Sequence, residues 1–100
     1  MKNEISFLEE LYYTIEKKAK SKDSKSYTKQ LLKNGKNKIA QKVGEESSEL
    51  IIDYLNGSKK RTIEEASDLL YHIFVMLYSK KISLIDIKKE LQKRKNVRHK

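Results

Sequence analysis

The sequence contains no proline and only three glycines in 100 residues, so very little in it interrupts a helix. Lys, Leu, Ile and Glu, which favour helix, are abundant, and apolar residues recur every three or four positions in four stretches. No alternation typical of a β-strand competes with this spacing. We therefore expect an all-α protein, an antiparallel helical bundle of about four to five helices, in a single domain over residues 1–100.

The spacing predicts two helices in the first third of the chain. An amphipathic helix covers about residues 4–20, and the polar segment 21–26 that follows is typical of a loop. A short helix runs from Thr28 to Asn34. It ends where Asn34 is followed by Gly35, because glycine readily adopts the left-handed conformation that stops a helix.

Three further helices are expected in the remainder. A long helix over about residues 37–56 ends at Gly57, and a turn at 57–61 leads to a third long helix over about 63–79. This third helix is apolar nearly all round, which predicts a central position. The last helix begins after Ser83 and continues into a basic tail, expected to be disordered at 95–100. The core-facing residues expected on the 37–56 helix and the last helix are Ile39, Val43, Leu50, Ile51 and Tyr54, and Leu84, Ile87 and Leu91.

Composition excludes several classes of protein. The chain has no cysteine, which rules out disulfides, thiolate metal sites and cysteine nucleophiles. It also lacks an apolar run of about 18 residues that could span a bilayer and the apolar segment of a signal peptide. We expect a soluble, cytoplasmic protein that does not enter a membrane. Because so short a chain buries a small core, self-association is also expected.

Charge is unevenly distributed. The net charge is +9, which suggests a polyanionic partner such as a nucleic acid, a lipid headgroup or a nucleotide with several phosphates. Residues 45–68, however, hold seven of the 14 acidic residues and only three basic ones, so this segment has a net charge of −4 and the rest of the chain +13. An acidic segment within a basic chain is not what even mixing of surface charge produces.

Two pairs of carboxylates in the acidic segment have the spacing of one helical face. Glu46 and Glu49 lie on one predicted helix, and Glu65 and Asp68 lie on the next. An antiparallel hairpin can bring the pairs face to face, where four carboxylates repel one another unless a cation neutralises them. An all-oxygen cluster suits Mg²⁺ or Mn²⁺. The basic residues that could then hold phosphate are Lys38, Lys42 and the Lys59-Lys60-Arg61 turn.

Each of these residues also has a simpler interpretation. Carboxylates three residues apart are common on solvated helix faces, and Thr62 with Glu65 matches a capping box at a helix start. Asp68 favours a bound partner, because a carboxylate within an otherwise apolar helix is costly to bury alone. His72 is interpreted as a hydrogen-bonded orienting or core histidine rather than a ligand.

Two short features allow two interpretations as well. Ser26, Tyr27 and Thr28 precede a short helix and offer hydroxyl and N–H groups to a phosphate, although Ser and Thr are also ordinary N-caps, which is the default. Gly44 lies within a predicted helix, where glycine costs about 1 kcal/mol relative to alanine. Either a neighbouring helix approaches closely there, or the cost is tolerated.

Longer motifs carry a family resemblance. They are Ser26-Tyr27-Thr28, Gly35 to Ile39, Lys42-Val43-Gly44-Glu45-Glu46-x-x-Glu49, and Glu64-Glu65-Ala66-x-Asp68-Leu69-Leu70-Tyr71-His72. In this order and spacing, the chain resembles the phosphoribosyl-ATP pyrophosphatase family of histidine biosynthesis from Leu8 to about Arg94. The carboxylate pairs alone are shared with the wider all-α NTP pyrophosphatase superfamily of MazG type.

The resemblance implies an enzyme, a Mg²⁺-dependent hydrolase that converts phosphoribosyl-ATP to phosphoribosyl-AMP and pyrophosphate as a homodimer. By motif, the metal-binding acids are Glu46, Glu49, Glu65 and Asp68, with Mn²⁺ as an alternative ion. Glu45 matches the other acid of the motif, so Glu45 or a metal-bound carboxylate such as Glu46 is expected to take the proton of the attacking water. The expected substrate-binding residues are Ser26, Tyr27, Thr28, Lys38 and Lys42.

Two other functions remain as alternatives. A house-cleaning nucleoside triphosphate pyrophosphatase of MazG type would share the carboxylate pairs, although the motifs that contain Tyr27 and Gly44 argue against it. A small basic helical protein that binds nucleic acid would account for the charge of +9. The interior position expected for Asp68 is hard to explain on that hypothesis.

Overall fold

The computed structural model describes the backbone of residues 4–97 and the side chains of residues 7–95. Within that range the chain forms five helices and no strand, so the prediction of an all-α bundle is confirmed. The helices are α1 (Glu4–Lys20), α2 (Tyr27–Asn34), α3 (Lys36–Asn56), α4 (Lys59–Ser79) and α5 (Leu84–Val97).

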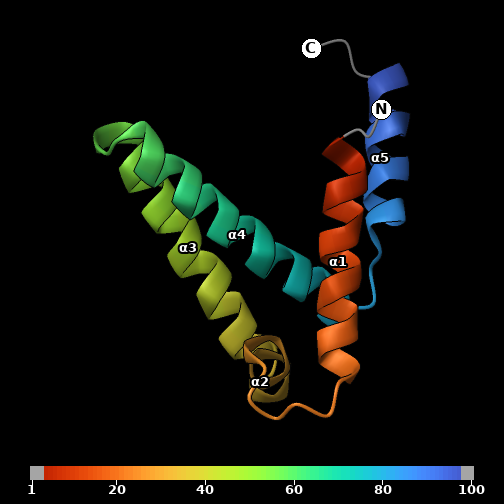
Figure 1. Ribbon diagram of the computed structural model, residues 1–100. Coiled ribbons are helices and arrows are strands. Elements are labelled where there is room, and N and C mark those ends of the chain that lie inside the picture. The colour runs from red at the N-terminus through yellow and green to blue at the C-terminus, as the bar shows by residue number, and fades with distance from the viewer. Residues whose placement is uncertain (1–3, 98–100) are drawn as a thin grey trace.

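The two longest helices form an antiparallel hairpin, and the other helices gather at one end of it. Figure 1 shows α3 and α4 side by side along their lengths, with α2 lying across the end of the hairpin opposite the turn. α1 crosses the C-terminal part of α4, and α5 runs beside α1. α4 contacts α1, α2 and α3, so the prediction that it is central is confirmed.

Short polar signals and glycines set the helix ends. Gly35 has φ +95° and its N–H donates to the Leu32 carbonyl, so it ends α2 as predicted and α3 begins at the next residue. Gly57 ends α3 in an extended conformation, and its N–H donates to the Asp53 carbonyl. The predicted turn at 57–61 is too long. The Ser58 hydroxyl accepts from the Arg61 N–H and caps α4, which therefore begins at Lys59 rather than near 63.

The core lies where the first four helices meet. Its buried residues come from each of them: Ile15, Leu31, Ile39, Phe74 and Val75. Tyr12 packs edge-on against Phe74, and its hydroxyl donates to the Ile82 carbonyl, which ties the α4–α5 connection to α1. This small core supports the hairpin at one end only.

Many apolar side chains outside this core are exposed. On α3, Ile39 is buried as predicted, whereas Ile51 and Tyr54 are 57% and 75% exposed, because α1 and α2 cover only the other end of the hairpin. On α5, Leu84 packs against the core, whereas Ile87 and Leu91 line a groove beside α1 and α4 and remain 37% and 61% exposed, so they face inward as predicted but are not buried. The radius of gyration is 15.2 Å, against about 13 Å for a compact domain of this length. The chain is open rather than closely packed.

Two expectations concern the C-terminus and the membrane. α5 continues to Val97, so the first three residues of the tail expected to be disordered at 95–100 are helical, and 98–100 lie outside the described residues. None of the described helices combines the length and the apolar character needed to cross a bilayer.

Candidate functional site

The hairpin brings three glutamates together. Glu46 and Glu49 of α3 and Glu65 of α4 each have a carboxylate oxygen within 4.8 Å of the other two. Glu46 and Glu65 are buried, with 8% and 4% of their surface exposed, while Glu49 lies on the exposed side. We call these three residues the glutamate cluster. The expectation that the two carboxylate pairs meet across an antiparallel hairpin therefore holds for three of the four residues.

Asp68 differs from the prediction. It is exposed on α4 and lies outside the glutamate cluster, so the expectation of an interior position was wrong. A residue three positions after Glu65 is rotated about 60° around the helix from it, which takes Asp68 to the border of the packed face. Its negative charge still contributes to the environment of Glu65.

Two oxygens of the glutamate cluster lack a partner. Oε1 of Glu46 and Oε1 of Glu65 are buried, and neither has a hydrogen-bond partner. Burial raises the pKa of the Glu65 carboxyl, and the neighbouring Glu49 carboxylate raises this pKa further, while Arg61 opposes the shift. Buried carboxylate oxygens without a donor are unfavourable unless a cation compensates them. The donor set, three hard oxygens with no sulfur, fits Mg²⁺ or Mn²⁺.

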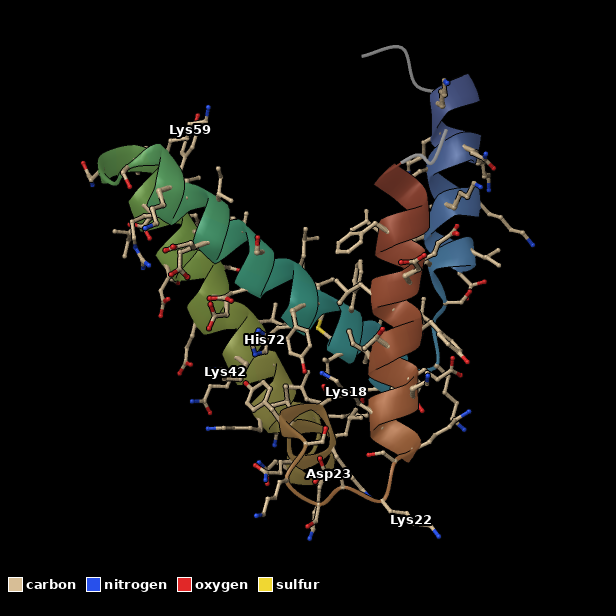
Figure 2. The ribbon with its side chains drawn as sticks, in the orientation of Figure 1. Lys18, Lys22, Asp23, Lys42, Lys59 and His72 are labelled. Atoms are coloured by element: carbon tan, nitrogen blue, oxygen red, sulfur yellow. The ribbon has the colours of Figure 1, made fainter. Side chains whose placement is uncertain are left out.

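Arg61 flanks the glutamate cluster on one side. Its guanidinium lies 2.7 Å from Oε2 of Glu65, 2.8 Å from Glu64 and 3.6 Å from Asp53. Sequence reasoning placed Arg61 in a phosphate-binding turn and did not single out Asp53, although Asp53 follows Glu49 by one helical turn. Figure 2 shows Lys59 at the tip of the hairpin, far from Lys42. Of the three basic residues in the predicted turn, Arg61 is thus paired with carboxylates of this chain, and Lys59 lies away from Lys42.

The capping-box interpretation of Glu65 is wrong. Because α4 starts at Lys59, Thr62 and Glu65 both lie inside the helix rather than at its first residues. The Thr62 hydroxyl lies within donating distance of two carbonyls, that of Ser58 at 2.9 Å and that of Asp53 at 3.1 Å. Glu65 is thus free of the backbone at the helix start and belongs to the glutamate cluster.

Lys42 flanks the other side of the cluster. Its Nζ lies 3.7 Å from Glu46 Oε2 and 3.7 Å from Glu45 Oε1. Burial lowers the pKa of Lys42, but the Tyr27 hydroxyl and the carboxylates of Glu46 and Glu45 outweigh it, so this pKa is raised and the amine stays protonated. Lys38 is exposed one turn earlier on α3.

Glu45 is the exposed acid next to the cluster. Its carboxylate accepts a hydrogen bond from the Gln41 amide at 2.9 Å, which lowers its pKa, and the positive charges of Lys42 and Lys38 lower this pKa further. Glu45 is therefore an ionised carboxylate that water can reach. It does not belong to the glutamate cluster.

The segment before and at the start of α2 is held against α4. The Ser26 hydroxyl caps α2 by accepting from the Lys29 N–H, so the default prediction of an N-cap is confirmed. Thr28 is buried, and its hydroxyl is hydrogen-bonded to the Tyr71 hydroxyl, a partner that sequence reasoning missed. Of the three predicted residues, Tyr27 has the most surface left for a ligand, because it is 49% exposed.

His72 links this segment to α4. Its Nδ1 lies 2.8 Å from the Asp68 carbonyl oxygen, which can only accept, so Nδ1 carries the proton. In the neutral ring Nε2 then accepts from the Tyr27 hydroxyl, at 2.8 Å. Figure 2 shows His72 and Lys42 at the same level of the hairpin, close to α2. The prediction of a hydrogen-bonded histidine is confirmed.

Gly44 has no close neighbour in the described part of the chain. A Cβ built on it would meet nothing within 4 Å, and the residue is exposed on α3. The alternative of a close helix approach is thus not found within this chain. The helix tolerates the cost of this glycine.

Together, these features define a class: an all-α protein whose long antiparallel hairpin holds a cluster of three glutamates, two of them buried, beside two basic side chains. A family model described as phosphoribosyl-ATP pyrophosphohydrolase matches residues 8–95. The chain belongs to this family, and the resemblance found in the sequence motifs is confirmed.

Similar proteins come from several organisms. A phosphoribosyl-ATP pyrophosphatase of Sulfolobus acidocaldarius is 44% identical over 87 residues, which cover 87% of this chain and 92% of the relative. One from Bacillus cytotoxicus is also 44% identical, over 87% of this chain and 81% of the relative. A histidine biosynthesis bifunctional protein HisIE of Bacteroides thetaiotaomicron is 45% identical over 93% of this chain. The chain spans only 47% of that bifunctional relative.

Proposed function

We propose that this protein hydrolyses phosphoribosyl-ATP to phosphoribosyl-AMP and pyrophosphate in histidine biosynthesis. The observation that carries the proposal is the glutamate cluster, with two buried and unpartnered oxygens, in a chain of the phosphoribosyl-ATP pyrophosphohydrolase family. The relatives named phosphoribosyl-ATP pyrophosphatase support the same substrate, and the histidine biosynthesis bifunctional protein HisIE supports the same pathway. An enzyme of this kind, acting on a nucleotide, is expected in the cytoplasm.

The glutamate cluster would hold the metal ion. Glu46, Glu49 and Glu65 supply the oxygens, and Asp68 can join them from the adjacent turn of α4. The ion is Mg²⁺, or Mn²⁺ in its place, because these hard cations prefer oxygen ligands and bind phosphate oxygens. When bound, Mg²⁺ supplies positive charge to the triphosphate and acidifies bound water.

Basic and hydroxyl side chains would bind the substrate around this cluster. Lys42, kept protonated by its neighbours, would bind phosphate, and Lys38 would add charge one turn away. Tyr27 would contact the nucleotide through its exposed surface. Ser26 and Thr28 would act mainly by holding Tyr27 in place, since their hydroxyls are already hydrogen-bonded.

Glu45 would accept the proton of the water that attacks the α-phosphorus. Its carboxylate is ionised and accessible, and it neighbours Glu46 without belonging to the cluster. Glu46 remains the alternative base, but a carboxylate bound to a cation is less available for a proton. Pyrophosphate then leaves as the second product.

The protein would act as a homodimer. Large apolar side chains are exposed at both ends of the molecule, among them Leu91 on α5 and Leu55 on α3. Exposed apolar surface of this extent marks an interaction surface in a chain whose own core is small. A second copy of the chain would cover these side chains and close the open arrangement of helices.

The decisive experiment follows phosphoribosyl-ATP by phosphorus NMR with and without Mg²⁺. Phosphoribosyl-AMP and pyrophosphate should form only with the metal. Glu49→Gln and Asp68→Asn should each reduce the rate, while Glu90→Gln, which removes an exposed glutamate paired with Arg94 on α5, should leave it unchanged. Wild-type rates in both Glu49→Gln and Asp68→Asn would contradict the site.

Parallel assays separate the alternatives. A pyrophosphatase of MazG type would turn over ordinary or damaged dNTPs faster than phosphoribosyl-ATP. A nucleic-acid-binding protein would release no pyrophosphate and would bind DNA or RNA with steep salt dependence. Neither alternative accounts for all of the motifs and the buried glutamates.

A further inference from the structure

The two basic residues beside the glutamate cluster act on it in the same way. Arg61 lies 2.7 Å from Oε2 of Glu65 and leaves Oε1 of this carboxylate buried without a partner. Lys42 lies 3.7 Å from Oε2 of Glu46 and likewise leaves Oε1 without a partner. Each basic residue is four positions from its glutamate on the same helix, and each therefore occupies one of two carboxylate oxygens.

The contact made by Arg61 is the firmer one. It is a hydrogen bond to a side chain that is only 5% exposed, and the same guanidinium also contacts Glu64 and Asp53. Three carboxylates from two helices thus fix the position of the guanidinium. Oε2 of Glu65, the oxygen bonded to Arg61, consequently has little freedom to turn toward a cation, and only Oε1 remains available.

A carboxylate with one free oxygen selects among cations. Mg²⁺ is small, requires near-octahedral geometry and binds carboxylates through single oxygens, whereas Ca²⁺ takes more ligands and accepts both oxygens of one carboxylate. Coordination through one oxygen satisfies Mg²⁺ and deprives Ca²⁺ of ligands. This difference does not depend on the charge of Arg61, which acts on both divalent cations alike.

We propose that Arg61 is a specificity-determining residue, which keeps Glu65 a one-oxygen ligand and thereby favours Mg²⁺ over Ca²⁺ at the glutamate cluster. The inference rests on the metal site of the proposed function and adds to it a reason for the choice of cation. Arg61 acts through Glu65 and is a positioning residue rather than a catalytic one. Asp53 supports it by holding the guanidinium from α3.

The test measures cation binding without substrate. Mn²⁺ is bound to the full chain and followed by electron paramagnetic resonance, and Mg²⁺ or Ca²⁺ is then added to displace it. In Arg61→Gln, the ratio of Mg²⁺ to Ca²⁺ affinity should fall on the order of tenfold, the scale on which residues that orient metal ligands act. Arg61→Lys, which retains a charge but not the planar fork, should give an intermediate ratio.

Two further variants complete the test: Arg94→Gln controls for the loss of a positive charge, and Asp53→Asn tests whether Asp53 supports Arg61. Arg94→Gln removes an arginine that pairs with Glu90 over the same spacing on α5, away from the cluster, and should leave the ratio unchanged. Asp53→Asn should lower the ratio by a smaller factor than Arg61→Gln. The backbone N–H of residue 61 still donates to Ser58 in Arg61→Gln, so α4 keeps its cap. Circular dichroism verifies the helix content of each variant.

The outcomes distinguish the two proposals. An unchanged ratio in folded Arg61→Gln, with Mg²⁺ still bound by the wild-type chain, would overturn the role of Arg61 and leave the hydrolytic function standing. A wild-type chain that binds neither cation would overturn the metal site and this inference together. A lowered ratio in Arg61→Gln and an unchanged one in Arg94→Gln support the inference.

Discussion

The acidic end of the hairpin and the groove beside α5 are opposite in chemistry. In the glutamate cluster, negative charge is buried with too few positive partners, and two carboxylate oxygens have no hydrogen bond. In the groove between α1, α4 and α5, apolar side chains such as Leu70, Ile87 and Leu91 are exposed around a space of about 530 Å³. The first region offers oxygen ligands to a cation, and the second offers apolar surface to another protein molecule.

The two regions should therefore respond to different experimental conditions. A buried anionic cluster responds to metal ions and to pH, because both change its charge. An exposed apolar groove responds to protein concentration, because only another molecule can cover it. Changes in the cluster should therefore alter cation binding and catalysis without altering association, and changes in the groove should do the reverse.

The largest expected effect is at the cluster. Glu46→Gln removes a buried carboxylate that is a proposed metal ligand, and it should reduce hydrolysis on the order of a thousandfold while abolishing Mn²⁺ binding. Glu45→Gln should lower kcat by about a hundredfold with Mn²⁺ binding retained, because the proposed role of Glu45 is to accept a proton and not to hold the ion. Steady-state kinetics and Mn²⁺ titration measure the two separately. Loss of Mn²⁺ binding in Glu45→Gln would contradict this division of roles.

The groove should give the next largest effect. Leu91→Glu places a charge in the groove at a site that is 61% exposed in one chain. If the groove forms the interface of the proposed dimer, this change should weaken association by at least about a hundredfold, since burying a leucine contributes about 1.5–3 kcal/mol in each copy. Sedimentation velocity over a range of concentrations measures the change. Lys89→Glu, an exposed position of α5 that does not line the groove, is the control. A dimer unaffected by Leu91→Glu would assign the interface to another face.

A smaller effect concerns pH and stability without metal. The pKa of Glu65 is raised in the folded state, so the folded protein holds this proton more tightly than the unfolded chain does. The stability gained from protonated Glu65 is therefore present at low pH and lost as pH rises through the titration of Glu65. Glu49→Gln removes the neighbouring negative charge and should reduce this loss.

Thermal unfolding at several pH values, with a chelator present, measures the difference between the wild type and Glu49→Gln. Mg²⁺ should raise the melting temperature of the wild type more than that of the variant, because a bound ion stabilises the folded state. Identical pH profiles for the two proteins would show that the two carboxylates do not interact.

The smallest effect tests the outer face of α3. Gly44→Ala should stabilise the chain by about 1 kcal/mol, because glycine is unfavourable inside a helix and an added Cβ would meet nothing within 4 Å. Denaturant unfolding measures the gain. Weaker dimerisation in Gly44→Ala would instead indicate that a second copy packs closely on this face.

Local features of the fold were predictable from the sequence. Gly35 and Gly57 end helices where expected, because the effect of a glycine on a helix end depends only on residues within one turn of it. The start of α4 was missed, because Ser58 and Thr62 are both competent caps and only the hairpin geometry decides between them. Ile87 and Leu91 have inward-facing spacing on α5, but which surface covers a helix is a tertiary property.

The candidate site was predictable in the same partial way. The spacing of Glu46, Glu49 and Glu65 indicated that they could meet across a hairpin, and they do. The apolar character of the predicted 63–79 helix placed Asp68 in the interior, whereas the packing of the hairpin leaves it exposed at the border. The contact between Arg61 and Asp53 joins two helices, and the sequence alone does not show it.

By itself, the sequence determined that this chain is helical, where most helices end and which acids share a helical face, because these properties depend on residues within one or two turns. Only the tertiary structure decided which of the acids are buried, and which carboxylate oxygens Arg61 and Lys42 occupy. Burial and ion pairing across the hairpin depend on how two helices are placed against each other. That placement is set by the small core at one end of the molecule.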